Sequence, residues 1–169
     1  GFGAAVCRRF AKAGARVIAA GRRGARLKAL KKELGARCRT AEFDVRSRKE
    51  TDAALAALPG EFSKINLVVA NAGLALGLEG AAQANVEDWE TMIATNINGL
   101  LYTVRAVLPG MVARDQGHVI LIGSVAADYP YPGGNVYGAT KAFVKQFALN
   151  LRADLLGSTV RVTNIEPGL

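Results

Sequence analysis

The sequence predicts an α/β protein in which helices cover both faces of a doubly wound parallel sheet, giving three layers. Short, mostly apolar runs of strand length alternate along the chain with longer segments whose apolar residues recur at helical spacing. The connections between these segments are short, and runs without polar alternation fit strands that are buried on both faces. We expect the 169 residues to form a single domain, 1–169.

Five segments are expected to be strands, because each is a short run rich in Val, Ile or Ala that ends at Gly, Asn or an acidic residue. They are residues 17–20, 38–43, 65–70, 118–122 and 160–165. Five further segments carry apolar residues at helical spacing, and most of them stop at a glycine. They are residues 4–13, 24–34, 49–58, a long helix from about residue 86 that Pro109 and Gly110 interrupt, and residues 137–156.

A serine, a tyrosine and a lysine follow the fourth expected strand. Ser124 lies at the carboxyl end of that strand, which is the edge where open α/β sheets bind ligands. Tyr137 and Lys141 are four residues apart in the next helix, so their side chains share one helical face. The Pro- and Gly-rich loop between strand and helix can fold back and bring Ser124 toward that face.

These residue types permit proton transfer at a hydroxyl or carbonyl group. A free tyrosine has a pKa of about 10, and a nearby ammonium favours the phenolate by on the order of 1–3 pKa units. Tyr137 could then exchange a proton with a substrate oxygen while the Ser124 hydroxyl hydrogen-bonds that oxygen. The alternative is an ordinary helix with a surface lysine, because Tyr-x-x-x-Lys also occurs by chance.

A serine hydrolase is a second alternative for Ser124. The Gly-x-Ser-x-Gly pattern is absent, because Ile122 and Ala126 occupy the flanking positions. The single histidine, His118, begins the strand that Ser124 follows, roughly 20 Å away at ~3.3 Å per residue. That separation rules out a hydrogen bond between them, so the sequence argues against hydrolysis.

The net charge of +8 is concentrated near the start of the chain. Residues 1–50 hold fifteen Lys and Arg against four Asp and Glu, whereas the remainder holds seven against ten. Such a basic segment is typical either of a surface that binds a polyanion or of helix faces that are exposed to solvent. Because no aromatic residues interleave with the basic ones, we expect no nucleic-acid partner and assign some of this charge to a single phosphate.

Other compositional features exclude further classes. No apolar run approaches the ~20 residues that span a bilayer, so we expect no membrane partner. Cys7 and Cys38 lie in different expected elements and suggest reduced, buried thiols in a cytoplasmic protein. With a single histidine and no cysteine cluster, no metal site is expected.

Ser124, Tyr137 and Lys141, with twelve residues between the serine and the tyrosine, resemble the active site of the short-chain dehydrogenases/reductases. The resemblance extends over the whole chain and implies a Rossmann-like fold. Asn96, in Asn96-x-x-Gly99, matches the family asparagine that helps carry protons through water from the lysine to solvent. The resemblance implies that these four side chains are catalytic, and that the serine and the tyrosine also bind substrate.

The resemblance also implies a dinucleotide coenzyme. Gly1-Phe2-Gly3 looks like the end of the family's glycine-rich turn, where backbone N–H groups meet the pyrophosphate at a helix N-terminus. The other matching positions are Asp44 and Val45 beside the adenine, Asn71 beside the adenosine, Tyr137, Lys141, and Pro167, Gly168 and Leu169 beside the nicotinamide. The family's first glycine, a preceding central strand and a later substrate-covering segment have no counterpart, so we expect a domain incomplete at both ends.

The end of the strand at residues 17–20, which would be the second strand in a complete family member, indicates which coenzyme is used. A carboxylate there would bind the ribose 2′-hydroxyl of NAD and repel a 2′-phosphate. The sequence instead has Gly21 followed by Arg22 and Arg23. Because guanidinium groups suit phosphate, we expect NADP.

Several sequence segments resemble one group within the family more closely. They include Gly-Arg-Arg, the segment before Tyr137 and the final Ile165-Glu-Pro-Gly-Leu169. They are similar to the bacterial NADP-dependent 3-hydroxy acid dehydrogenases. This resemblance implies hydride transfer with L-serine, L-allo-threonine or 3-hydroxypropanoate and malonic semialdehyde, in a homotetramer. The alternatives are an NADP-dependent carbonyl reductase with another substrate and a catalytically silent NADP-binding regulatory domain.

Overall fold

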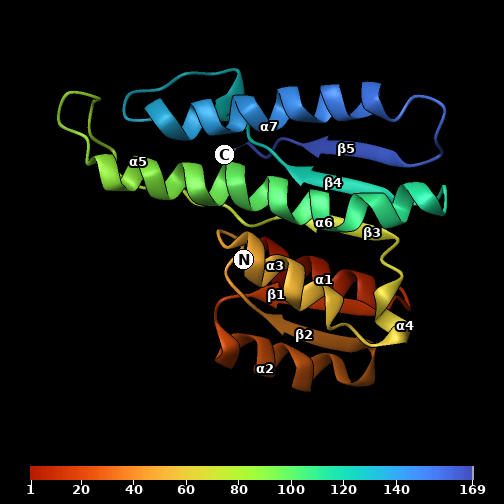
Figure 1. Ribbon diagram of the computed structural model, residues 1–169. Coiled ribbons are helices and arrows are strands. Elements are labelled where there is room, and N and C mark those ends of the chain that lie inside the picture. The colour runs from red at the N-terminus through yellow and green to blue at the C-terminus, as the bar shows by residue number, and fades with distance from the viewer. Residues whose placement is uncertain (169) are drawn as a thin grey trace.

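The computed structural model describes residues 1–168 and confirms the predicted α/β fold with parallel strands (Figure 1). The strands are β1 (Val17–Gly21), β2 (Cys38–Glu42), β3 (Leu67–Ala70), β4 (His118–Ile122) and β5 (Arg161–Ile165). The helices are α1 (Phe2–Lys12), α2 (Gly24–Leu34), α3 (Arg48–Ala56), α4 (Gly60–Ser63), α5 (Val86–Ile93), α6 (Gly99–Ala113) and α7 (Asn135–Asp154). Two 3₁₀ turns, η1 (Gly35–Arg37) and η3 (Val125–Ala127), and a π-helical segment, η2 (Ala94–Asn98), complete the elements.

The strands form two hydrogen-bonded groups. In one, β1 pairs with β2; in the other, β4 lies between β3 and β5, and every pairing is parallel. Within residues 1–168 no strand pairs with both β1 and β3, so the ladder is interrupted there. The strands of both groups nevertheless point the same way, and the carboxyl ends of all five lie at one edge (Figure 1).

The winding of the chain places helices on two faces. From β1 the chain moves outward to β2, and then returns to β3 and continues in the opposite direction to β5 (Figure 1). Because crossovers between parallel strands are right-handed, this reversal puts α2 on one face and α6 and α7 on the other. The contacts agree, since α1 packs on α2, whereas α3 packs on α6 and α5 packs on α7.

Most expected boundaries hold to within two residues, and those of α2 and β4 match throughout. Two corrections concern individual residues. The third strand begins at Leu67 and not at Ile65, since the N–H of Ile65 bonds the carbonyl of Ser63 in a turn at 3.1 Å. Helix α6 runs through Pro109, which was expected to interrupt it. Proline has no N–H, so the carbonyl of Arg105 in the preceding turn lacks its helical donor. Both Arg105 and Pro109 are exposed, so water can bind that carbonyl.

The main core lies where β3, β4 and β5 meet α6 and α7. Its most deeply buried members are Met111, Val119 and Leu121, each 0% exposed, and Val144 and Ala148, each 1% exposed. A smaller cluster between α1, α2 and the first two strands contains Cys38, and Cys7 packs against it. Both cysteines are free thiols, and burial raises the pKa of each. No helix in the part of the chain that the structure describes has the length and apolarity needed to cross a membrane.

Candidate active site

Ser124 begins the turn that follows β4. Its side-chain oxygen accepts a hydrogen bond from the N–H of Ala126 at 3.1 Å and so caps η3. The residue before it, Gly123, donates its N–H to the carbonyl of Ile165 at 2.7 Å, which extends the pairing with β5 beyond the strand. Ser124 is therefore half-buried at the carboxyl edge of the sheet, as the sequence predicted.

Lys141 connects α7 to the end of the same strand. Its Nζ donates to the carbonyl oxygen of Ile122 at 2.9 Å and lies 5.7 Å from the ring centre of Tyr137. The residue is only 6% exposed, and this burial lowers the pKa of its ammonium group. The structure thus confirms that Tyr137 and Lys141 share a helical face, and it turns that face toward the strand that precedes Ser124.

A glycine permits the close approach of the serine-bearing turn to the helix. A Cβ atom on Gly138 would lie 3.0 Å from the carbonyl oxygen of Ala126. Because a side chain there would press on the backbone of η3, glycine lets this turn lie directly against the first turn of α7. Ser124, Tyr137 and Lys141 therefore come from elements in mutual contact.

Asn96 lies deeper, in the π-helical segment between α5 and α6, and is 2% exposed. Its side-chain oxygen accepts the N–H of Leu74 at 2.9 Å, and its amide nitrogen donates to the carbonyl of Leu74 at 2.9 Å and to Oγ1 of Thr140 at 3.0 Å. A Cβ on Gly73 would lie 3.4 Å from this asparagine's oxygen and 3.5 Å from Nζ of Lys141. Asn96 and Lys141 therefore face each other across Gly73. The π-helical segment that carries Asn96 is a feature often found at functional sites.

Sequence reasoning missed Thr140. Its hydroxyl donates to the carbonyl of Tyr137 at 2.8 Å and accepts from Asn96, so it links two of the expected catalytic residues. Its only sequence signal is its place next to Lys141. A buried threonine in a helix ordinarily bonds a carbonyl of the preceding turn, so position alone did not distinguish it.

The start of α1 faces the end of β3. Gly1 is the residue before the first helical turn, and no side chain caps the N–H groups that follow. A Cβ on Gly3 would lie 2.9 Å from the side-chain nitrogen of Asn71, whereas one on Gly1 would meet nothing within 4 Å. Helix N-termini with open backbone N–H groups attract anions, so the geometry of Gly1, Phe2 and Gly3 suits the predicted pyrophosphate position, and Asn71, predicted beside the adenosine, lies next to Gly3.

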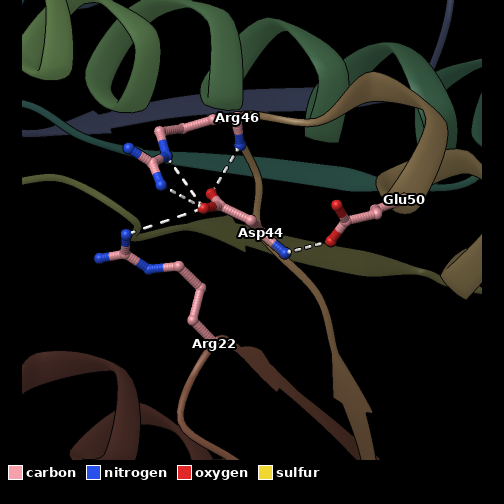
Figure 2. Close-up of polar contacts among 4 residues, drawn as sticks. All are labelled: Arg22, Asp44, Arg46 and Glu50. Carbon is pink, nitrogen blue, oxygen red and sulfur yellow. Dashed lines mark hydrogen bonds and ion pairs between the residues drawn. The ribbon is translucent and has the colours of Figure 1, made fainter.

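The residues after β1 and β2 form a group of charges (Figure 2). Arg46 binds the carboxylate of Asp44 through Nε at 2.9 Å and Nη2 at 2.6 Å, and Arg22 approaches the same carboxylate to 3.8 Å. The hydrogen bonds from Arg46 hold the pKa of Asp44 below its ordinary value, despite partial burial. Arg23, the residue before α2, has no carboxylate within ion-pair distance among the described residues.

The remaining predicted coenzyme positions lie along the same edge. Val45 packs on the first residue of α6, since a Cβ on Gly99 would lie 2.7 Å from Cγ2 of Val45. The carbonyl of Pro167 accepts the N–H of Val125 at 3.2 Å, and Gly168 follows it next to the same valine. Leu169 lies outside the described residues.

His118 is far from this edge. It begins β4, and its Nε2 lies 2.8 Å from Oγ1 of Thr163 in the neighbouring strand. Burial lowers the pKa of its imidazole, and the nearby Arg161 acts in the same direction. Because His118 and Ser124 are at opposite ends of one strand, the structure agrees with the argument against a hydrolase.

The chain belongs to the short-chain dehydrogenase family: residues 1–169 match the family described as short chain dehydrogenase. Among curated relatives, the NADP-dependent 3-hydroxy acid dehydrogenase of Salmonella typhi is 62% identical over 169 residues, which are 100% of this chain and 68% of the relative. The serine 3-dehydrogenase of Agrobacterium fabrum is 53% identical over the same residues, again 68% of its length.

Solved structures agree with this assignment. The crystal structure of serine dehydrogenase from Escherichia coli has a TM-score of 0.99 and 61% identity, covering 100% of this chain and 78% of that one. The closed form of serine dehydrogenase complexed with NADP+ has the same TM-score of 0.99 and 61% identity, and this chain covers 68% of it.

Proposed function

We propose that this protein is an NADP-dependent oxidoreductase that acts on a small 3-hydroxy acid, or on the corresponding semialdehyde or keto acid. The observation that carries the proposal is the placement of Lys141, whose buried ammonium lies 5.7 Å from the ring centre of Tyr137 and binds the carbonyl just before the serine turn. The relatives named as 3-hydroxy acid and serine dehydrogenases, at 62% and 53% identity, support the substrate class.

The residues present fit NADP. The open N-terminus of α1 suits the pyrophosphate, and Asn71, next to Gly3, would lie beside the adenosine. Arg22 and Arg23 follow a strand end without a carboxylate and suit the 2′-phosphate. Asp44 and Val45 would hold the adenine end, and Pro167, Gly168 and Leu169 would border the nicotinamide. NADP, when bound, accepts or supplies the hydride.

The proton chemistry falls to the chain's own side chains. We assign Tyr137 as the group that exchanges a proton with the substrate oxygen, and Lys141 as the positive charge beside its ring. Ser124 binds the substrate oxygen, and its hydrogen bond matters most while charge develops there. Asn96, which faces Lys141 across Gly73, is assigned the role that the family resemblance implies, support of a proton path from Lys141 toward solvent.

The finer features of the proposal follow from the family resemblance. L-Serine, L-allo-threonine and malonic semialdehyde are the substrates that the family resemblance favours, and the name of the relative from Agrobacterium fabrum supports serine in particular. The family resemblance also favours a homotetramer. Two free thiols fit a cytoplasmic location.

The test follows NADPH absorbance in the full-length protein with 3-hydroxy acids, semialdehydes, steroids, sugars and acyl thioesters. We expect oxidation of L-serine or L-allo-threonine and reduction of malonic semialdehyde. Tyr137→Phe should lower kcat by at least ~10²-fold, the usual range for a lost acid–base group, and leave NADP binding nearly intact.

Tyr102→Phe provides the matched control, because it removes a tyrosine hydroxyl from α6 and not from the proposed site. It should leave kcat unchanged. If Tyr137→Phe turned over at the wild-type rate, the proposed mechanism would be wrong. Activity confined to steroids, sugars or acyl thioesters would instead contradict the substrate class.

A further inference from the structure

Arg46 is a charged residue at the coenzyme edge to which the function above assigns no role. It lies in the turn between β2 and α3, and its guanidinium group points to the carboxylate of Asp44 (Figure 2). Three of its donors reach that carboxylate. The backbone N–H bonds Oδ1 at 3.0 Å, and Nε and Nη2 bond Oδ2 at 2.9 and 2.6 Å.

Arg22 approaches the same carboxylate less closely. Its Nη1 is 3.8 Å from Oδ2 of Asp44, which is ion-pair distance but too long for a hydrogen bond. Arg22 is also more exposed than Asp44, with side-chain exposures of 52% and 22%. The carboxylate is therefore hydrogen-bonded by Arg46, and the guanidinium of Arg22 keeps its donors available.

The turn that carries Arg46 is fixed by further bonds. The N–H of Asp44 donates to Oε2 of Glu50 at 3.0 Å, the N–H of Ser47 donates to the carbonyl of Asp44 at 3.0 Å, and Ser47 caps α3. These contacts fix the backbone positions of Asp44 and Arg46 relative to each other. Two further carboxylates lie near this turn: Glu50 binds the N–H of Asp44, and Glu42, at the end of β2, lies against Gly24; neither is within ion-pair distance of Arg22 among the described residues.

Removing Arg46 would change the surroundings of Arg22. Asp44 would lose its two side-chain donors, and a carboxylate with free lone pairs would remain 3.8 Å from a guanidinium group. Because paired Arg–carboxylate hydrogen bonds are strong and directional, Arg22 would be expected to close onto Asp44. The unneutralised carboxylate would also repel a nearby phosphate.

We propose that Arg46 is a positioning residue for coenzyme preference: by binding Asp44, it leaves the guanidinium of Arg22 available for the 2′-phosphate of NADP. This inference rests on the proposed NADP dependence. It assigns to Arg46 an effect on NADP and not on NAD, since NAD lacks that phosphate. The effect acts through Asp44 and needs no contact between Arg46 and the coenzyme.

The test measures dissociation constants for NADP+ and NAD+ by calorimetry in the full-length protein. Arg46→Ala should lower the NADP:NAD affinity ratio at least fivefold and leave NAD+ affinity within twofold of wild type. In the double variant Asp44→Asn/Arg46→Ala the ratio should return toward the wild-type value, because a neutral amide no longer draws in Arg22. Arg48→Ala is the matched control, since it removes an equal charge two residues further on, where the partner is Asp52.

Each outcome decides between explanations. If Arg46→Ala weakened both coenzymes equally, its role would be structural only and the proposal would be wrong. If the ratio fell but Asp44→Asn did not restore it, Arg46 would act on the phosphate directly, which also overturns the proposal. A wild-type protein without preference for NADP would instead refute the proposed function, so the two failures are distinguishable.

Discussion

Lys141 combines a positive charge with nearly complete burial. At 6% exposure its ammonium has lost most of its water, and the carbonyl of Ile122 is the partner that replaces it. A buried cation is costly unless its donors are bonded, so this lysine is held at some expense of stability. This destabilising effect fits a residue that is retained for its charge beside Tyr137 and not for packing.

The lowered pKa of Lys141 predicts a pH dependence of stability. Between its folded pKa and the ordinary lysine value of about 10.4, the unfolded chain binds more protons than the folded chain, so stability rises with pH. In Lys141→Met this contribution is absent. Urea unfolding at several pH values should therefore show wild type gaining free energy of unfolding relative to the variant as the pH rises toward 10. Parallel pH curves would contradict the assignment.

At the scale of elements, the π-helical segment η2 positions Asn96 to bond the loop after β3. Both backbone groups of Leu74 depend on this one side chain, with N–H and carbonyl bonds of 2.9 Å each. The same amide reaches Thr140 of α7. One residue therefore joins the β3 loop, the α5–α6 segment and α7, which are the elements that surround the proposed site.

Asn96→Leu should destabilise the protein by about 2 kcal/mol, because it leaves polar groups of Leu74 without partners in a part-buried loop. The free energy of unfolding from urea titration measures this effect. Asn150→Leu, at an exposed position on α7, is the control and should change stability by less than about 0.5 kcal/mol. Equal effects of the two substitutions would show that the bonds to Leu74 contribute little.

How far the sequence predicted these elements depends on the range of the interactions that form them. The bounds of α2 and β4, and the shared face of Tyr137 and Lys141, follow from local periodicity and were predicted. The surroundings of Asn96 in the π-helical segment were not predicted, because its side chain bonds residues 22 and 44 positions away, which local periodicity does not reveal. The role proposed for Arg46 was not predicted for another reason: an arginine two residues after an aspartate is ordinary turn chemistry until Arg22 is seen near the same carboxylate.

At the scale of the whole molecule, side chains connect the two groups of strands. Among the described residues the β1–β2 pair and the β3–β5 group share no ladder, and α3 and α6 pack across the division. Val45, just after β2, lies against Gly99 at the start of α6. This contact couples the predicted adenine end of the coenzyme site to the helix that follows Asn96.

Gly99→Ala tests that coupling. Its Cβ would lie 2.7 Å from Cγ2 and 3.1 Å from Cβ of Val45, so overpacking of about 1–3 kcal/mol should exceed the gain of about 1 kcal/mol in helix propensity. Gly110→Ala in the same helix would meet only the flexible end of Arg114, at 3.2 Å, and should be neutral or stabilising.

The double variant Val45→Ala/Gly99→Ala separates the effect of the contact with Val45 from the effect of alanine on helix propensity. Because Val45→Ala removes the methyl groups that the new Cβ would strike, Gly99→Ala should cost little in this background and should there resemble Gly110→Ala. Free energies of unfolding for wild type, both single variants and the double variant give the coupling energy, which we expect to reach about 1 kcal/mol or more. Additive effects would mean that the two halves of the fold are joined elsewhere, through the remaining contacts between α3 and α6.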